Sequence, residues 1–218
     1  MKIDRISIQG SASVHCRSCF YSARDCLLEF SCYTFIRGVN TLVGEIDSGA
    51  WAASYLLSMY EYRPKDFILL EPVKATLHGE SVSFRELTSL SCYMDRVYPL
   101  FSDESTVREM ITQGLEHSAL DYSCQDIKEL FCLDDQRFER PLRSVGNEIF
   151  RAMAAIGLSY GKEIFCFPWL SRQRFDGYHR NMTGLFEILE SLGKITISPV
   201  GYDVQGSSSG LHPSERHG

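Results

Sequence analysis

Apolar residues recur along the chain with two different periods, and segments of the two kinds alternate. A period of two, or a short continuous apolar run, predicts strands, at residues 1–10 (an edge strand), 26–36, 39–44 (a buried strand), 67–84 (a hairpin), 90–94, 163–168 and 195–200. A period of 3.6 predicts helices, at residues 50–60, 105–133, 147–160 and 178–192. This alternation predicts an α/β fold with a largely parallel central sheet, flanking helices and an N-terminal antiparallel β subdomain.

Local signals indicate where several of these segments begin and end. Ser105 or Thr106 is a suitable cap for the helix that follows, because an acid stands in its first turn. Gly161 and Gly193 each follow a helical segment, where a left-handed residue ends many helices. We expect residues 1–203 to form one domain, with a small helical subdomain at about 104–140. Residues 204–218 are polar and of low complexity, and we expect a flexible tail.

Composition narrows the class of function. The chain has 218 residues, of which 44% are hydrophobic, and a net charge of -6. Acidic and basic residues are interspersed, so no basic surface for nucleic acid is expected. No apolar run reaches the roughly 20 residues of a membrane span, and we expect a cytoplasmic protein. The eight cysteines include the pair Cys16 and Cys19, but no second pair follows at zinc spacing, so we expect reduced thiols and no metal.

The segment GEIDSGAWA, residues 44–52, joins the predicted strand at 39–44 to the first predicted helix. A phosphate-binding loop needs convergent backbone N–H groups, a lysine for the phosphates and a Ser or Thr hydroxyl for magnesium. Gly44 and Gly49 have the spacing of such a loop, and Ser48 lies between them. However, Ala50 stands at the lysine position and Trp51 at the hydroxyl position. The alternative is an ordinary strand-to-helix turn of an unrelated α/β protein.

The order of the segments resembles the nucleotide-binding domain of ABC transporters, from the first strand to about residue 203. Several residues fall at the positions of that family's motifs. They are Tyr21 (the aromatic residue that stacks on adenine), Gly44 to Trp51 (Walker A), Asp95 (Q-loop), Ser144, Gly146 and Asn147 (signature), Cys166 and Phe167 (Walker B), and residues 198–202 (the switch histidine). Residues 77–82 are similar to the hairpin that follows the family's first helix.

The residues at these positions depart from the chemistry of the family. Phosphoryl transfer depends on carboxylates that hold the metal and orient the attacking water, and Cys166 and Phe167 supply none. Asp95 replaces the glutamine, and no histidine occurs between His179 and His212. The resemblance therefore implies a pseudo-ATPase without a cofactor, which binds ATP and magnesium weakly at most, or through the site of a partner.

Three hypotheses follow. The first is a non-catalytic ABC-type ATPase homologue that acts as a structural or regulatory subunit, beside an intact ABC ATPase or a membrane subunit, in a homodimer or heterodimer. The second is a half-active heterodimer in which Ser144 completes the ATP site of a partner; alternatively, Ser144 only caps a helix. The third is an enzyme or small-molecule binder with a pocket rebuilt around Trp51, Cys166 and Trp169. A basic cluster at Arg172, Arg174, His179 and Arg180 is interpreted as a solvated loop and helix start.

Overall fold

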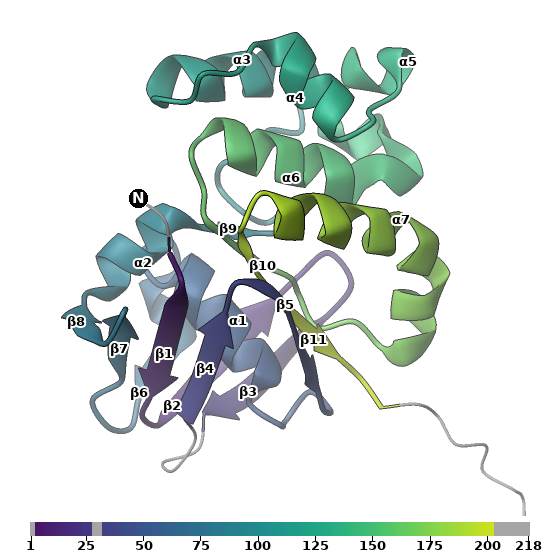
Figure 1. Cartoon of the computed structure of the whole chain (residues 1–218). Coiled ribbons are helices and arrows are strands. Elements are labelled where there is room, and N and C mark those ends of the chain that lie inside the picture. The colour runs from purple at the N-terminus through teal and green to yellow at the C-terminus, as the bar shows by residue number, and fades with distance from the viewer. Residues whose placement is uncertain (1–2, 28–31, 203–218) are drawn as a thin grey trace, which may run out of the picture.

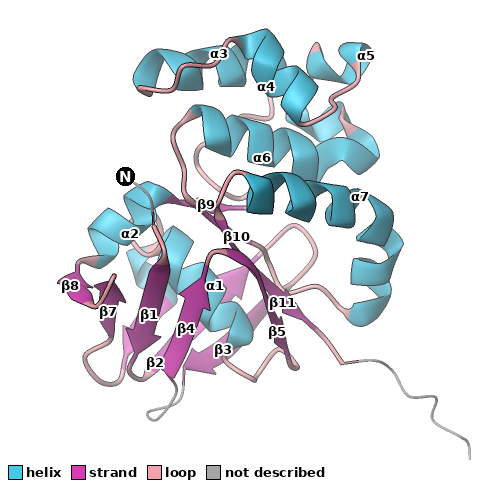
Figure 2. Cartoon of the chain, in the orientation of Figure 1, coloured by secondary structure: helices cyan, strands magenta, loops and turns pink. Residues whose placement is uncertain are grey.

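A computed structural model describes residues 3–27 and 32–202, except for the side chains of His179 and Arg180. The predicted tail at 204–218 and part of the predicted strand at 26–36 lie outside these residues. Figure 1 traces the chain from β1 to β11, and Figure 2 separates helices from strands. Three groups of strands pack with seven α-helices of the described chain, which confirms the α/β class.

The central sheet has four parallel strands in the order β5-β11-β10-β9. Its strands are β5 (Gly38–Val43), β9 (Ser91–Tyr93), β10 (Ile164–Cys166) and β11 (Ile195–Val200). The three strands that follow β5 in this order are buried along their whole length. The prediction that residues 39–44 form a buried strand is wrong, because β5 lies at the edge of the sheet. Val43 is therefore 56% exposed.

Two antiparallel sheets form the N-terminal part of the chain. One has the order β4-β1-β7-β8 and the other the order β3-β2-β6. Their strands are β1 (Arg5–Gln9), β2 (Ala12–Arg17), β3 (Ser22–Leu27), β4 (Cys32–Ile36), β6 (Phe67–Leu69), β7 (Lys74–Leu77) and β8 (Glu80–Val82). The predicted edge position of the first strand is wrong, since β1 pairs with β4 on one side and with β7 on the other. Its alternation reflects one buried face, and an internal strand has that pattern as readily as an edge strand.

Helix α1 (Ala50–Met59) lies in the centre of the molecule. It contacts β9, β10 and β11 of the parallel sheet as well as β2 and β3 of the antiparallel sheet. All ten of its residues are buried. A helix that is enclosed in this way has no polar face, which explains why the segment is apolar on every side.

The remaining helices cover the parallel sheet and extend beyond it. They are α2 (Phe84–Leu90), α3 (Val107–His117), α4 (Cys124–Leu130), α5 (Asp135–Phe138), α6 (Ile149–Ser159) and α7 (Arg172–Ser191). Helix α2 was not predicted, although a capping box of Ser83 and Glu86 marks its start. Helix α7 begins at Arg172, earlier than predicted, because Ser171 caps its first turn. Arg172 and Arg174 are therefore helical residues.

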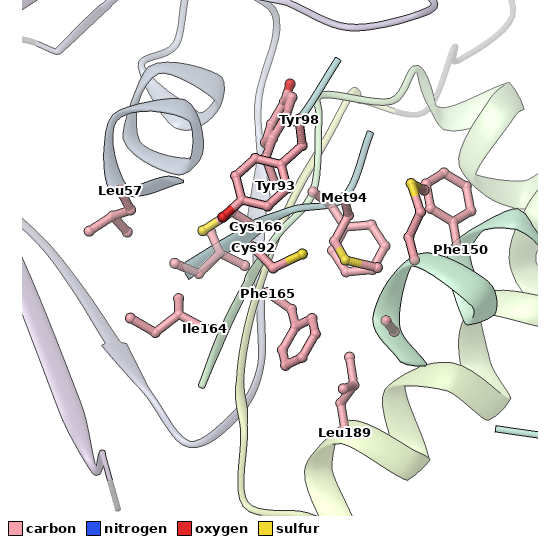
Figure 3. Close-up of a cluster of buried hydrophobic side chains, with 14 of the residues drawn as sticks. Leu57, Cys92, Tyr93, Met94, Tyr98, Phe150, Ile164, Phe165, Cys166 and Leu189 are labelled. Atoms are coloured by element: carbon pink, nitrogen blue, oxygen red, sulfur yellow. The ribbon is translucent and has the colours of Figure 1, made fainter. Parts of the chain in front are cut away.

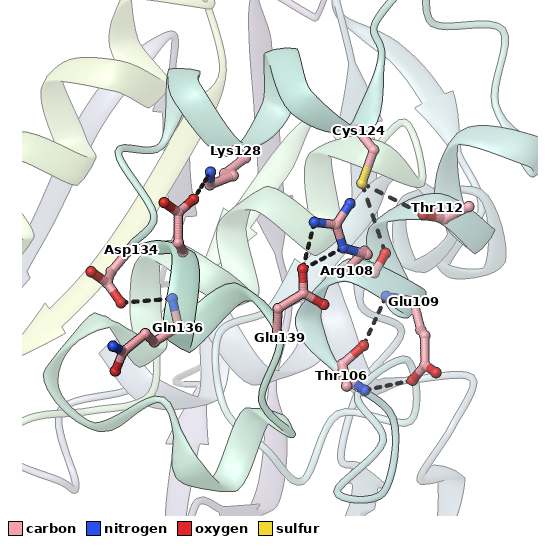
Figure 4. Close-up of polar contacts among 10 residues, drawn as sticks. Thr106, Arg108, Glu109, Thr112, Cys124, Lys128, Asp134, Gln136 and Glu139 are labelled. Atoms are coloured by element: carbon pink, nitrogen blue, oxygen red, sulfur yellow. Dashed lines mark hydrogen bonds and ion pairs between the residues drawn. The ribbon is translucent and has the colours of Figure 1, made fainter.

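Helices α3, α4 and α5 form a layer over α6 at the top of Figure 1. Local hydrogen bonds and ion pairs cap these helices and connect them to one another, as Figure 4 shows. Thr106 and Glu109 make a reciprocal capping box at the start of α3. Arg108 of α3 pairs with Glu139, and Lys128 of α4 pairs with Asp135. Of the two caps predicted for this helix, Thr106 is the one that forms.

Candidate functional site

The loop that resembles Walker A joins β5 to α1 and is held by contacts to its own backbone. The N–H of Gly44 donates to the carbonyl of Val200 at the end of β11, at 2.9 Å. The backbone N and the Oγ of Ser48 both donate to the carbonyl of Glu45. A Cβ on Gly44 would lie 2.4 Å from the Ser48 Oγ. Gly44 is therefore required by the close turn itself.

The carboxylate of Asp25 occupies the N-terminus of α1. Its Oδ1 accepts a hydrogen bond from the N–H of Gly49, and its Oδ2 accepts one from the N–H of Ala52, each at 2.8 Å. Oδ1 also accepts from the N–H of Cys26 at 2.9 Å. The N–H groups at the start of a helix after a glycine-rich loop are those that bind phosphate in other proteins. Here a side chain from β3 uses them.

Asp25 is completely buried, with 0% exposure. Burial raises the pKa of its carboxyl group, and the N–H donors of Ala52 and Gly49 oppose that rise. Gly49 makes this close approach feasible. Its φ is +83°, and a Cβ there would lie 2.7 Å from both the Cys26 carbonyl oxygen and the Tyr33 hydroxyl. The position where a phosphate would enter is thus filled by β3 and β4.

Trp51, at the predicted hydroxyl position of the loop, is also completely buried. Its indole Nε1 donates to the Tyr93 hydroxyl at 2.9 Å, and that hydroxyl donates to the carbonyl of Arg17 at 3.0 Å. Tyr55 packs edge-on against Tyr93, with ring centroids 5.2 Å apart. The indole therefore connects α1 to the ends of β9 and β2. Ala50 is buried as well, at 3% exposure.

The loop between β2 and β3 crosses to the end of β9 and binds Asp95. Both carboxylate oxygens of Asp95 accept from the backbone N–H of Cys19, at 3.0 and 3.1 Å, and Oδ1 accepts from Val97. Asp95 is 3% exposed, and burial raises the pKa of its carboxyl group. The predicted Q-loop position is thus a structural carboxylate that anchors this loop.

Tyr21, at the predicted position of the adenine-stacking residue, follows in the same loop. Its ring packs edge-on against Trp169, with centroids 5.2 Å apart. Its hydroxyl accepts from Nε of Arg174 at 3.0 Å, and the same guanidinium lies 4.7 Å from the centre of the Phe20 ring. The Trp169 indole in turn donates to the Gly44 carbonyl at 2.8 Å. Tyr21 is therefore part of an aromatic and basic cluster that reaches from the loop to α7.

Cys166 and Phe167, at the predicted Walker B positions, are completely buried. Burial raises the pKa of the Cys166 thiol well above its ordinary range. Figure 3 places Cys166 in the apolar cluster with Cys92 and Tyr93. The Phe167 ring packs against Phe150 and Phe186, at centroid distances of 5.6 and 5.4 Å. These two positions thus belong to the apolar core.

The signature-like segment lies on the surface before α6. Ser144 and Gly146 are exposed. Gly146 has a φ of +70° and no atom within 4 Å of the place of a Cβ. Asn147 uses its side-chain oxygen to accept from Arg137 at 2.5 Å. The alternative that Ser144 caps the following helix is wrong, because it belongs to a separate 3-10 turn, Leu142–Ser144, and Glu148 precedes α6.

The remaining candidates are dispersed. Residues 198–200 complete β11, where Ser198 is completely buried, while Tyr202 is 56% exposed. Trp51, Cys166 and Trp169, around which a rebuilt pocket was considered, are 0%, 0% and 6% exposed, so a ligand there would have to displace them. Arg172 of the basic cluster pairs with Asp176 at 2.9 Å. All eight cysteines are free thiols, and no metal-binding group of three ligands occurs within the described residues.

The sequence reasoning missed Asp25 and Tyr93, and it interpreted Arg174 as part of a solvated cluster without its contact to Tyr21. Asp25 had a usable signal, because it lies in phase with Leu27 on the buried side of β3. A buried acid on an alternating strand requires donors, and the start of α1 supplies them. Tyr93 and Arg174 carried no comparable signal, since their partners come from distant segments.

Comparison with solved structures identifies the fold. The chain is similar to an ABC transporter ATP-binding protein from Pyrococcus furiosus, with a TM-score of 0.59, 13% identity and 94% of each chain covered. It is similar to cbiO1 from Clostridium perfringens, part of the ABC transporter complex cbiONQ, with a TM-score of 0.57, 12% identity and 93% and 80% coverage. A dimeric ATP-binding cassette bound to ADP and Pi gives a TM-score of 0.56, 12% identity and 91% and 88% coverage.

The chain thus has the fold of an ABC transporter ATP-binding domain. No family model matches the sequence, and no curated protein matches it. In the described part of the chain, no helix combines the length and apolar character that a membrane crossing requires. At this level of identity the comparison establishes the fold, and the chemistry of the site has to be argued from the residues.

Proposed function

We propose that this protein is a non-catalytic ABC-type ATPase homologue that acts as a structural or regulatory subunit of a transporter or ATPase assembly. The observation that carries the proposal is the carboxylate of Asp25, bound at 2.8 Å by the N–H groups of Gly49 and Ala52. A phosphate and this carboxylate compete for the same donors. The carboxylate is covalently part of the chain and already in place, so nucleotide binding would require its displacement.

The other positions of the site support the same function. Ala50 supplies no positive charge for the phosphates, and Trp51 has its indole N–H engaged by Tyr93. Cys166 and Phe167 offer no carboxylate to a metal, and both are buried. Catalysis of phosphoryl transfer is mainly electrostatic. A site without lysine, metal ligands and general base therefore lacks the groups that carry it.

The likeness to transporter subunits guides the choice of partner. One similar protein is part of a transporter complex, and another is dimeric. We propose an intact ABC ATPase or a membrane subunit as the partner, in a homodimer or heterodimer, with the protein in the cytoplasm and at the membrane only through that partner. Residues 1–203 would act as one ABC ATPase-like domain with a helical subdomain at about 104–140. We propose no role for nucleic acid.

Calorimetric titration with MgATP and an ATPase assay test this function. We expect no saturable binding up to about 1 mM MgATP and no hydrolysis above a heat-treated control. ATP hydrolysis by the purified chain that disappears in Gly49→Ala or Tyr21→Ala would contradict the proposal. Purification of a tagged form of the chain from its native cell then tests assembly, and we expect an intact ABC ATPase or a membrane subunit to co-purify with it in a defined stoichiometry.

A second candidate, completion of a partner's ATP site, has one specific observation in its favour. Ser144 and Gly146 are exposed, and the space beside Gly146 is open, so a phosphate held by another subunit has access to both residues. Addition of this chain should then raise the ATPase rate of the partner. Ser144→Arg should abolish the gain without loss of association, whereas Ser89→Arg, the same change on the exposed surface of α2, should preserve it.

A further inference from the structure

A cavity of about 200 Å³ lies between the β2–β3 loop, the end of β9 and helices α6 and α7. Its apolar wall consists of side chains from all four elements: Phe20, Met94, Ile149, Phe150, Met153 and Tyr178. Figure 3 shows Met94 between Tyr93 and Phe150. Met94 is 0% exposed and Met153 is 1% exposed, whereas Phe20 and Tyr178 are partly exposed, so the cavity reaches from the core to the surface.

Fixed contacts hold the cavity open. The Phe150 and Tyr178 rings meet edge to face at 5.4 Å, and Phe20 lies 6.5 Å from Tyr178. On the opposite side, the β2–β3 loop is attached to β9 through the hydrogen bonds from Cys19 to Asp95. These contacts fix the elements on both sides of the cavity, so the side chains cannot easily move together and fill it. Preformed pockets of this kind are typical of ligand sites.

The charged groups at the cavity favour an anion. Arg96 and Arg143 are among the residues that line it. Arg143 is exposed, and its side chain has no ion pair within the described residues. Arg96 pairs with Asp103 at 3.8 Å. It also interacts with the Cys19 thiol and with the Asp95 carboxylate. The single acid of the wall, Asp95, is buried and directs both oxygens at backbone N–H donors, so its charge is largely compensated.

Size and chemistry define the ligand class. At about 30 Å³ for each water, the cavity corresponds to roughly six or seven waters, which suits one aromatic ring with a small substituent. Aromatic and thioether side chains favour a planar ring. Guanidinium groups bind carboxylates with good geometry. The ring would contact Phe150 and Met153, and the carboxylate would bind Arg143.

We propose that this cavity is a binding site for a small aromatic carboxylate. The site is independent of the proposed subunit function, because it requires neither a nucleotide nor a partner chain. It uses residues from the β2–β3 loop and from α6 together, so a bound ligand would connect the antiparallel part of the molecule to the segment that contains Gly146.

NMR of the full chain with labelled methionine methyl groups tests the proposal, with benzoate as the probe. We expect saturable shifts of the Met94 and Met153 methyl resonances up to about 10 mM benzoate. Met59 and Met110 are buried elsewhere, and their resonances should remain unchanged. Benzyl alcohol has the same ring without the charge, and it should bind about fivefold more weakly or worse.

A matched pair of variants tests the contribution of the guanidinium group. Arg143→Gln should weaken benzoate binding about fivefold or more, while Arg140→Gln, an exposed arginine that does not line the cavity, should have no effect. Both variants alter exposed side chains and should fold normally. Unchanged Met94 and Met153 resonances, equal affinity for benzyl alcohol, or unweakened binding in Arg143→Gln would each overturn the proposal.

Discussion

The indole nitrogen of Trp51 lies 2.9 Å from the hydroxyl oxygen of Tyr93, and both side chains are completely buried. We expect Trp51→Phe and Tyr93→Phe each to lower the free energy of unfolding by about 1–3 kcal/mol. Tyr93→Phe leaves the buried indole N–H without an acceptor, and Trp51→Phe removes one of the two hydrogen bonds of the Tyr93 hydroxyl. The double variant should lose less than the sum, by about 1 kcal/mol. Urea unfolding measures all three; strict additivity would show that the bond contributes nothing.

The carboxylate of Asp25 should stabilise the protein strongly. Asp25→Ala removes the acceptor of two buried backbone N–H groups of α1, and we expect a loss of about 2–3 kcal/mol in urea unfolding. Asp126 offers a comparison, because it also accepts from a backbone N–H, that of Ser123, but at the surface. Asp126→Ala should cost clearly less. Equal losses would indicate that the burial of Asp25 is unimportant.

Restoring the lysine of the loop should not restore ATP binding. Residue 50 follows Gly49 directly, and the N–H of Gly49 binds the buried Asp25. In Ala50→Lys the new ammonium group would stand near this carboxylate and pair with it. We expect MgATP to bind no more tightly than about 1 mM in calorimetry. A dissociation constant below about 0.1 mM would show that Asp25 does not block the site.

A comparison of substitutions at Gly49 and Gly79 distinguishes the cost of backbone strain from the cost of a steric clash. Both have positive φ, at +83° and +88°. A Cβ at Gly49 would meet the Cys26 carbonyl and the Tyr33 hydroxyl at 2.7 Å, whereas Gly79 has open space. Gly79→Ala should therefore cost about 1 kcal/mol and Gly49→Ala about 3 kcal/mol. Similar costs in thermal unfolding would contradict the close packing of β3 and β4 on this loop.

The stability contributed by Asp95 and Asp126 should depend on pH with opposite signs. Burial raises the pKa of Asp95, so its contribution is present below the unfolded value of about 4 and is lost as pH rises through the folded value. The Ser123 N–H lowers the pKa of Asp126, so its contribution is present above about 4 and is lost as pH falls.

Urea unfolding of the wild type and of single Asp→Asn variants over a pH series measures this difference. The free energy of unfolding of the wild type minus that of Asp95→Asn should decrease as pH rises above about 4. The free energy of unfolding of the wild type minus that of Asp126→Asn should decrease as pH falls below that value. The same sign for both variants would show that burial does not control the carboxyl group of Asp95.

Several helices and most strands of the parallel sheet were predictable because their signals are local, whereas β2 and α2 were missed. Apolar spacing located α1 and α6, and Gly161 and Gly193 end their helices with positive φ as expected. The positions of the strands within the sheets were harder to predict from the sequence. Whether β1 or β5 lies at an edge depends on partners far along the chain, and Val39 and Val43 look equally suited to a buried strand.

The candidate site divides in the same way. Residues 50, 51, 95, 166 and 167 could be assigned to motif positions from the order of the segments, and this assignment stays a prediction. The hydrogen bonds of Asp25, Tyr93 and Trp169 could not be predicted, because their partners lie far away in the sequence and come close only in the folded chain. Ser144 was a plausible cap by residue type, but the turn at Leu142–Ser144 separates it from α6.

The pairing of β5 with β11 also affects how the chain acquires its structure. Residues 38–43 align with residues 195–200, so the edge of the parallel sheet closes only when nearly the whole chain is present. During synthesis, β5 cannot pair with β11, and the apolar helix that follows β5 cannot be fully covered, until residues 195–200 have been made. Contacts of such long range slow folding and prolong the exposure of apolar surface. We therefore expect truncation before residue 195 to yield an aggregation-prone product.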